Sequence, residues 1–290
     1  MNSKSMKQNG SPELILVLNQ PDPLRRDVSL AVPIAPFAQG YPAPFQAEEW
    51  PALRQTTRNS GQKLYAMLPG FIMEEQLPAL DSLIRQLLDA DGIYYGDEAV
   101  YMAAKAAGYE GLLIFQPDTL VCSSADVKTL QRMGADVVSL AHELSLEEVL
   151  QIVGKTGGLE IQIQGYYPVL TSRRRLLSAY GQETGNPRIG PGVFELQEST
   201  RSSWITVLEQ EAGTVLFSPE AVSSLKQLPQ LQAAGIDRMR IDSRFLTPEQ
   251  RDRTVALCQA VLQGKAAEDD CIGSDAIWHR QSVKTKGESL

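Results

Sequence analysis

Eight short apolar segments, mostly separated by helical patterns, are the feature that most constrains the fold of this 290-residue chain. Most of them are too short and too uniformly apolar to be half-exposed strands, so they favour a parallel sheet covered by helices. The predicted strands are Glu13–Leu18, Leu30–Ile34, Lys63–Met67, Gly92–Tyr95, Leu112–Phe115, Val137–Leu140, Leu159–Ile163 and Arg238–Ile241.

The segments between these strands carry helix signals. Residues Glu74–Ala90 place leucine and isoleucine side chains on one stripe with a period of 3.6 residues. Three further helices have start or stop signals: one capped by Ser124 and ending at Gly134, one that opens with a Ser145–Glu148 capping box and ends at Gly154, and one that opens at Thr247.

Eight strands with mostly helical connections predict a (β/α)8 TIM-like barrel, and a doubly wound open sheet is the alternative. Trp204–Leu208 and Thr214–Phe217 flank a Glu-Ala-Gly turn and predict a small β-hairpin insertion, about 204–218, before the last strand. The Gly/Pro/Ser-rich residues 181–203 predict a long loop.

The chain is expected to form one barrel domain over residues 13–264, between a flexible N-terminus at 1–12 and a polar C-terminal tail at 265–290. Trp278 is the one large apolar residue of that tail and a candidate for docking. The sequence shows no secretory signal and no apolar run of the roughly 20 residues that span a bilayer, so we expect a cytoplasmic protein without a membrane partner.

Composition limits the functional classes. The chain has 43% hydrophobic residues and a net charge of -8, which disfavours non-specific nucleic-acid binding but allows a local basic site. The spacing of Cys122, Cys258 and Cys271 matches no metal motif, and the two histidines cannot build a His-rich metal site, so no metal is expected. Cys258 lies in an apolar helical run and is interpreted as a buried residue.

Functional groups of a barrel of this class follow the strands, at the C-terminal face. Asp97 is interpreted as a helix N-cap, with a ligand-facing carboxylate as the alternative. Asp242 is interpreted as pairing with Arg240 or Arg244 to hold the barrel mouth. The candidate residues at strand ends are Asp97, Gln116, His142, Glu143, Tyr166, Asp242 and Arg244, and Glu160 is a candidate inside the predicted strand Leu159–Ile163.

The strongest polar feature is the run Arg173, Arg174 and Arg175. It is either a solvated loop or a site for phosphate or carboxylate, for which guanidinium groups are suited. Tyr180, just after this run, is a further candidate. The sequence contains no nucleophile elbow, phosphate-binding loop or His-Glu-x-x-His helix, so it identifies no catalytic residue.

Three stretches resemble the collagenase-like peptidases of family U32. Ala141–Glu148 resembles a family run that follows a strand, and Gly235–Arg244 resembles the family's closing strand and turn. Residues 160–178 are in register with the family signature, which Glu160, Gly165, Leu177 and Ser178 match. Phe217-Ser218-Pro219 also has counterparts in the smaller bacterial members.

The departures from that signature concern cysteines. Pro168 and Arg175 stand where the signature has cysteines, Arg173 replaces a glycine, and Ser223 falls at a further cysteine position. Members with those cysteines are similar to iron–sulfur proteins that hydroxylate RNA bases or a quinone precursor, and such a cluster needs thiolate ligands. The resemblance therefore implies no cofactor in this chain and an iron–sulfur cluster in a cysteine-bearing paralogue.

Resemblance to the shorter members implies a role in forming 5-hydroxyuridine in tRNA. The leading hypothesis is a partner or substrate-binding subunit for a longer paralogue, in which the three arginines touch tRNA or the partner. The family label supplies one alternative, a peptidase, and a non-catalytic scaffold is the second.

Overall fold

The computed structural model describes residues 11–19, 27–200, 202–265 and 272–280. Eight parallel strands form its central sheet, in the order β7-β13-β1-β2-β3-β4-β5-β6, and pairing of β6 with β7 closes the sheet into a barrel. These strands are β1 (Glu13–Val17), β2 (Ser29–Pro33), β3 (Leu64–Leu68), β4 (Gly92–Tyr95), β5 (Leu112–Phe115), β6 (Val137–Ser139), β7 (Leu159–Gly165) and β13 (Arg238–Asp242). The predicted closed barrel is confirmed, and each predicted strand overlaps one of the eight.

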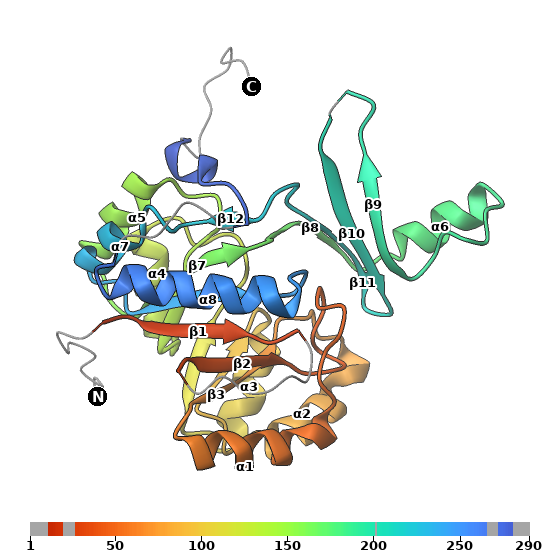
Figure 1. Cartoon of the computed structure of the whole chain (residues 1–290). Coiled ribbons are helices and arrows are strands. Elements are labelled where there is room, and N and C mark those ends of the chain that lie inside the picture. The colour runs from red at the N-terminus through yellow and green to blue at the C-terminus, as the bar shows by residue number, and fades with distance from the viewer. Residues whose placement is uncertain (1–10, 20–26, 201, 266–271, 281–290) are drawn as a thin grey trace.

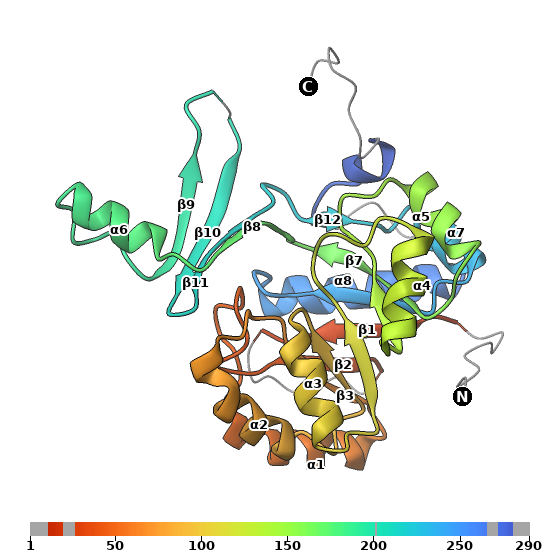
Figure 2. The same ribbon diagram turned by 180° about the vertical axis from the view of Figure 1, so that it is seen from behind.

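Helices surround the barrel (Figures 1 and 2). They are η1 (Ala47–Glu49), α1 (Trp50–Ser60), η2 (Glu74–Gln76), α2 (Leu77–Gln86), α3 (Glu98–Ala106), α4 (Ser124–Met133), α5 (Leu146–Val153), α7 (Leu228–Ala234) and α8 (Pro248–Leu262). The Ser145 and Thr247 side chains cap α5 and α8, as predicted. The predicted cap of α4 is wrong by one residue: Ser123 has the extended backbone of an N-cap, and its hydroxyl accepts from the Asp126 N–H.

The core has two layers because strand side chains alternate between opposite faces. An outer layer between strands and helices includes Leu16, Leu30, Leu68 and Ile241. An inner layer fills the barrel with Ile15, Val17, Ala31, Ala38, Tyr41, Tyr65, Met67, Tyr94, Ile114 and Val137. The inner layer is completed by charged side chains, which form the candidate site.

The insertion between β7 and β13 is larger than the predicted hairpin. The hairpin exists as β10 (Trp204–Gln210) and β11 (Gly213–Phe217), but it belongs to a four-stranded antiparallel sheet of order β8-β11-β10-β9. The other members are β8 (Pro168–Ser172) and β9 (Gly192–Gln197), and α6 (Leu176–Glu183) lies between them. The predicted loop at 181–203 is therefore wrong, because β9 and the end of α6 lie in it.

This insertion projects from one side of the barrel (Figures 1 and 2). Several of its polar contacts with the barrel are made by the loop after β2. The Gln210 amide accepts from the Gly40 N–H at 3.0 Å and donates to the Tyr41 carbonyl at 2.7 Å. Gln39 donates to the Ala212 carbonyl at 3.2 Å. The β10–β11 turn is thereby fixed beside the barrel mouth.

The short strand β12 (Val222–Ser223) pairs antiparallel with the end of β7. The helical turn η3 (Ala276–His279) packs on the same side of the barrel. Trp278 is buried there and donates its indole N–H to Ser224 Oγ at 3.1 Å. The prediction that Trp278 docks on the barrel domain is therefore confirmed. The predicted flexible residues 1–10 and the tail residues 266–271 and 281–290, with Cys271, lie outside the described residues. In the described part of the chain, no helix has the length and apolarity to cross a membrane.

Candidate functional site at the barrel mouth

Strand β13 supplies the charged groups of the barrel interior. Its sequence alternates charged and apolar residues, so Arg238, Arg240 and Asp242 share one face. Met239 and Ile241 face the other way, into the outer core. The three charged residues are at most 1% exposed. Burying charges is costly unless they are paired, so their partners determine whether this arrangement is stable.

At the lower level of the barrel, Glu160 is the central counter-ion. It accepts from Arg238 Nε at 3.4 Å, from Arg240 Nε at 3.0 Å and from the Tyr94 hydroxyl. Arg238 also pairs with Glu13 at 2.7 Å, and the Tyr65 hydroxyl donates to Glu13 at 2.7 Å. Glu160 therefore has a structural explanation as the carboxylate that neutralises two buried arginines.

At the upper level, Asp242 is the central acceptor. It pairs with Arg244 Nη2 at 2.6 Å and with Arg240 Nη1 at 3.4 Å, so the predicted pairing occurs with both arginines. The Tyr41 hydroxyl donates to Asp242 at 3.0 Å. The Arg244 guanidinium lies over the Tyr41 ring at 4.2 Å and the Phe217 ring at 5.1 Å, which joins the barrel to the inserted sheet.

The pairing is reflected in the pKa values. Burial alone would raise the pKa of Asp242, but the charge and hydrogen bonds of Arg244 and the charge of Arg240 bring it below the ordinary value. Burial raises the pKa of Tyr94, and the neighbouring Glu160 carboxylate adds to that rise. Asp242 is thus held ionised and Tyr94 neutral, which makes Tyr94 a hydrogen-bond donor.

The rim of the mouth is formed by the loop after β5 and the loop after β6. Asp118 Oδ1 lies 3.2 Å from His142 Nε2 and also accepts from the Gln116 amide. The His142 ring packs against the Tyr167 ring with the centroids 5.4 Å apart and the ring planes tilted by 31°. Burial raises the pKa of Asp118, but His142, Arg244 and Arg240 together bring it below its ordinary value. Its side chain is 23% exposed, so solvent reaches an ionised carboxylate here.

The loop that carries Asp118 has an unusual backbone. Asp118 and Leu120 both lie in the left-handed region, with φ of 64° and 75°. This region is uncommon for residues other than glycine, and such residues cluster at functional sites. Leu120 is also 77% exposed, so burial of its side chain does not account for the conformation.

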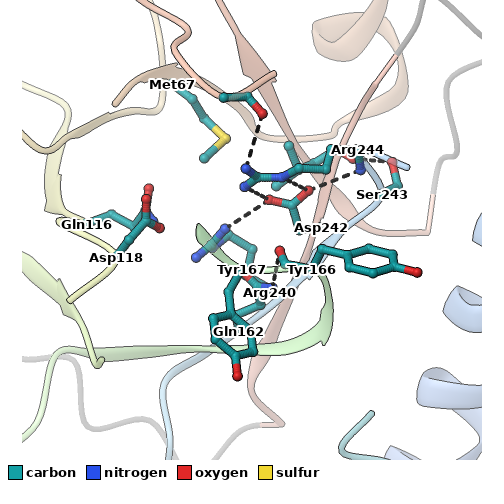
Figure 3. Close-up of polar contacts among 12 residues, drawn as sticks. Met67, Gln116, Asp118, Gln162, Tyr166, Tyr167, Arg240, Asp242, Ser243 and Arg244 are labelled. Carbon is teal, nitrogen blue, oxygen red and sulfur yellow. Dashed lines mark hydrogen bonds and ion pairs between the residues drawn. The ribbon is translucent and has the colours of Figure 1, made fainter. Parts of the chain in front are cut away.

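Four buried polar atoms in the barrel interior and mouth have no hydrogen-bond partner among the described residues: Gln116 Oε1, Ser139 Oγ, Gln162 Oε1 and Arg240 Nη2. Arg240 and Gln162 are register partners on neighbouring strands β13 and β7. Figure 3 shows Gln116 and Asp118 on one side of the mouth, facing Arg240 and Asp242. Because buried polar groups are nearly always satisfied, one donor, two acceptors and the Ser139 hydroxyl are available here for a bound molecule or water.

The remaining strand-end candidates lie elsewhere. Asp97 caps α3 by accepting from the Ala99 N–H at 2.9 Å, which confirms the capping interpretation, and it also accepts from the Ile72 N–H. Glu143 is exposed. Tyr166 packs edge-on against Phe245, and its carbonyl accepts from Gln162. The structure therefore brings Gln116, His142, Glu160, Asp242 and Arg244 into the barrel mouth and its interior, but not Asp97 or Glu143.

The arginine run and Tyr180 belong to the insertion. Arg173 and Arg174 are exposed, whereas Arg175 Nε lies 3.6 Å from Glu209. Glu209 is 1% exposed and accepts from the Leu177 and Ser178 N–H groups and from the Ser178 hydroxyl, at the start of α6. Tyr180 lines an apolar groove of about 530 Å³ between α6 and the sheet, with Leu177, Ile189, Phe194 and Leu216.

Two residues of the mouth were missed as candidates, Tyr41 and Gln162, and Arg240 is named above only as a possible partner of Asp242. The alternation Arg-Met-Arg-Ile-Asp over 238–242 is the signal that identifies Arg240, because an apolar/charged alternation in a strand covered by helices places charges inside the barrel. The same alternation of glutamate and glutamine with apolar residues in β7 identifies Gln162. No comparable pattern precedes Tyr41, which lies in a loop.

The cysteine positions of the family signature do not fit an iron–sulfur cluster here. Pro168 begins β8, Arg175 precedes α6, and Ser223 lies in β12 beside the end of β7. None of these residues carries a thiolate. The cysteines that the structure describes are Cys122, which is exposed, and Cys258, which is buried as predicted in α8. Residues within the described ranges form no metal-binding group of three or more His, Cys, Asp or Glu side chains.

Comparison with known proteins gives two curated relatives. The chain is 26% identical over 214 residues to tRNA hydroxylation protein P2 of Bacillus subtilis (strain 168), covering 71% of this chain and 69% of that protein. It is 26% identical over 190 residues to tRNA hydroxylation protein P of Escherichia coli (strain K12), covering 49% of this chain and 42% of that protein. The chain thus spans less than half of the Escherichia coli relative.

A solved structure of the U32 peptidase Mk0906 has a TM-score of 0.49 and 16% identity, covering 83% of this chain and 96% of that one. The family model described as peptidase family U32 matches residues 38–285, which include the whole barrel mouth and the insertion. On this match, the chain belongs to peptidase family U32.

Proposed function

We propose that this chain is a partner or substrate-binding subunit in the hydroxylation of tRNA uridine. The observation that carries the proposal is that Pro168, Arg175 and Ser223, which have no thiol group, stand at three positions where the family signature has cysteines. Two relatives named as tRNA hydroxylation proteins support the reaction class. A chain without those thiolates contributes binding, and a cysteine-bearing paralogue contributes the iron–sulfur cluster.

The insertion is the proposed surface for tRNA or the paralogue. Arg173 and Arg174 are exposed there, on a unit that projects from the barrel (Figure 1). A guanidinium group suits phosphate recognition, and two arginines on a projecting arm can reach an RNA backbone although the whole chain is acidic. The proposed complex is heteromeric and cytoplasmic.

The test is co-purification from the native organism with a tag on this chain. We expect a longer U32 paralogue that carries the cysteines, or tRNA, to co-purify in stoichiometric amount, as identified by mass spectrometry and RNA sequencing. A chain in which Arg173 and Arg174 are both alanine is the matched control, and Glu195→Gln, an exposed change on β9, tests for non-specific capture. Recovery of the chain without either partner contradicts the proposal.

A second measurement addresses the cofactor. After anaerobic iron–sulfur reconstitution, we expect this chain to show no stoichiometric cluster absorbance, and a paralogue with the cysteines to show it under the same conditions. A stoichiometric cluster in this chain alone contradicts the division of labour.

In the part of the chain described, neither histidine pairs with a serine or cysteine, so the peptidase alternative lacks a histidine-activated nucleophile. His142 contacts Asp118 and Tyr167, and His279 pairs with Asp275. A nucleophile paired with a base is the geometry that nucleophilic peptide hydrolysis requires. Incubation with gelatin and a mixed peptide library tests the alternative, and cleavage abolished by Asp118→Asn would establish it.

A further inference from the structure

The charge balance of the barrel mouth restricts the kind of molecule that fits it. The guanidinium groups of Arg238, Arg240 and Arg244 are all paired with the carboxylates of Glu13, Glu160 and Asp242. Asp118 adds a further carboxylate at the rim, and its pKa lies below the ordinary value. An anion bound in the mouth would meet no unpaired cation and one exposed carboxylate. The mouth therefore favours a neutral molecule.

The unpartnered atoms restrict the hydrogen-bonding pattern of that molecule. Arg240 Nη2 is a donor and Gln162 Oε1 is an acceptor, and both residues are fully or nearly fully buried. Their strands are neighbours and their Cα atoms are in register, so the two side chains lie at the same level of the barrel. A donor beside an acceptor matches a molecule that presents a carbonyl oxygen next to an N–H group.

The orientation of the Gln162 amide is fixed independently. Its Nε2 donates to the Tyr166 carbonyl at 3.1 Å, which leaves Oε1 as the free atom. Gln116 is fixed in the same way, because its Nε2 donates to Asp118 and its Oε1 is unpartnered. Both amides therefore present acceptors, and Arg240 presents the donor.

Access is from the rim. The unpartnered atoms are buried, whereas the Asp118 side chain is 23% exposed and the packed rings of His142 and Tyr167 lie next to it. The rim segment Gln116–Leu120 contains the two left-handed residues Asp118 and Leu120, so it is the strained element over the mouth. A flat molecule that enters here passes an aromatic pair and reaches the amides and the guanidinium group below.

From these observations we propose that the barrel mouth binds a pyrimidine base through its lactam edge, with Arg240 Nη2 donating to a ring carbonyl and Gln162 Oε1 accepting the ring N–H. This rests on the proposed function, since tRNA supplies such a base as uridine, and it adds the residues that hold the base. The base would leave its stack to reach the mouth, and its sugar and phosphates stay outside the negatively charged rim.

The first test is photo-crosslinking of the full-length chain to an RNA hairpin with one 4-thiouridine in its loop. We expect crosslinks in peptides that contain Gln116–Leu120 or Gln162–Tyr167. Crosslinks confined to Arg173–Arg175 would overturn the assignment of the mouth while leaving RNA binding, and thus the proposed function, intact. Absence of any RNA complex counts against the proposed function. In that case, the binding of free uridine described next decides whether the barrel mouth binds a pyrimidine base.

The second test is binding of free uridine to the unmodified chain by saturation-transfer NMR. We expect uridine to give a signal and 3-methyluridine, which lacks the ring N–H, to bind at least tenfold more weakly, because one good pair of hydrogen bonds to a base is worth about 1–3 kcal/mol. Equal signals from both nucleosides, or no signal from either, overturn the inference.

Substitutions in the mouth test which residues bind uridine. Gln162→Leu is expected to weaken uridine binding about tenfold or more. Gln164→Leu is the matched control, because Gln164 is buried on the same strand with an unpartnered Oε1, but its register partner Ile241 faces the outer core. If Gln162→Leu does not fold by circular dichroism, Gln116→Leu replaces it. Equal binding by the mouth variant and the Gln164→Leu control contradicts the assignment.

Discussion

The barrel mouth and the insertion use arginine in opposite ways. In the mouth, Arg240 and Arg244 are buried and locked against carboxylates, and Asp242 joins the two. On the insertion, Arg173 and Arg174 are exposed. Buried arginines fix the shape of a site and do not attract anions, whereas exposed arginines are available to a phosphate. Under the proposals above, the barrel would recognise the shape of its ligand and the insertion its charge.

The largest loss of folding stability is expected from breaking the network of buried ion pairs in the barrel. Glu160→Gln removes the carboxylate shared by Arg238 and Arg240 and leaves their charges buried without it. We expect the free energy of unfolding to fall by about 3–5 kcal/mol, measured by urea denaturation. Glu143→Gln, an exposed change, should stay within about 0.5 kcal/mol. A small effect at Glu160 would mean that the mouth is not held by this network.

The next effect concerns Gly165, where β7 ends against β13. Its φ is 112°, and a Cβ atom would lie 2.2 Å from the Asp242 carbonyl oxygen. We expect Gly165→Ala to cost roughly 1–3 kcal/mol for the backbone conformation and more for the overlap. Gly61→Ala is the control, since Gly61 has φ of 70° and nothing within 4 Å of the added Cβ. Similar losses in both variants would show that the close approach is unimportant.

A smaller and local effect is expected in the insertion. Glu209→Gln weakens charge-assisted hydrogen bonds to the start of α6, and we expect the insertion to lose about 1–3 kcal/mol, seen as faster amide exchange in α6. Glu195→Gln, exposed on β9, is the control. Unchanged protection of the Leu177 and Ser178 amides would contradict the capping role.

The same carboxylate gives a pH dependence. Burial raises the pKa of Glu209, but hydrogen bonds from Ser178, Leu177 and Thr214 bring it below the unfolded value of 4.5. Because the folded pKa is the lower one, the stabilisation is fully present above pH 4.5 and is lost as the pH falls through the folded pKa. Exchange in α6 should accelerate over that acid range in the wild type but not in Glu209→Gln. A pH-independent difference between the two would be evidence against this linkage.

The smallest effect on stability is expected from the exposed arginines. Replacing Arg173 and Arg174 with alanine should change the free energy of unfolding by no more than about 0.5 kcal/mol. The variant should weaken tRNA binding and reduce the salt dependence of the affinity by roughly 1 for each phosphate that is no longer neutralised, as measured by a binding titration at several salt concentrations. Unchanged affinity would remove the insertion from the RNA interface and favour the non-catalytic scaffold.

Individual strands and helices show how much of the fold a local sequence pattern predicts. Gly92–Tyr95 and Leu112–Phe115 are predicted with their observed bounds, because buried parallel strands are continuous apolar runs. The composition of residues 181–203 wrongly predicts a loop. The strand β9 within this stretch is exposed, begins with glycine and contains polar residues, so its composition resembles that of a loop. The predicted cap of α4 is displaced by one residue because Ser123 and Ser124 are adjacent and either hydroxyl is a suitable cap.

The sequence by itself determined the barrel, most of its helix caps and the positions that lack thiolates, since each depends on residues close together in the chain. It also contained the alternation in β13 that places three charges on one face. Only the tertiary structure decided which charges meet: pairing of β7 with β13 places Glu160 beside Arg238 and Arg240, 78 and 80 residues away in the chain. The hydrogen bond from Tyr94 on β4 to Glu160 on β7 spans the barrel, so it depends on strands that are distant in the sheet and meet only when the barrel closes through β6 and β7.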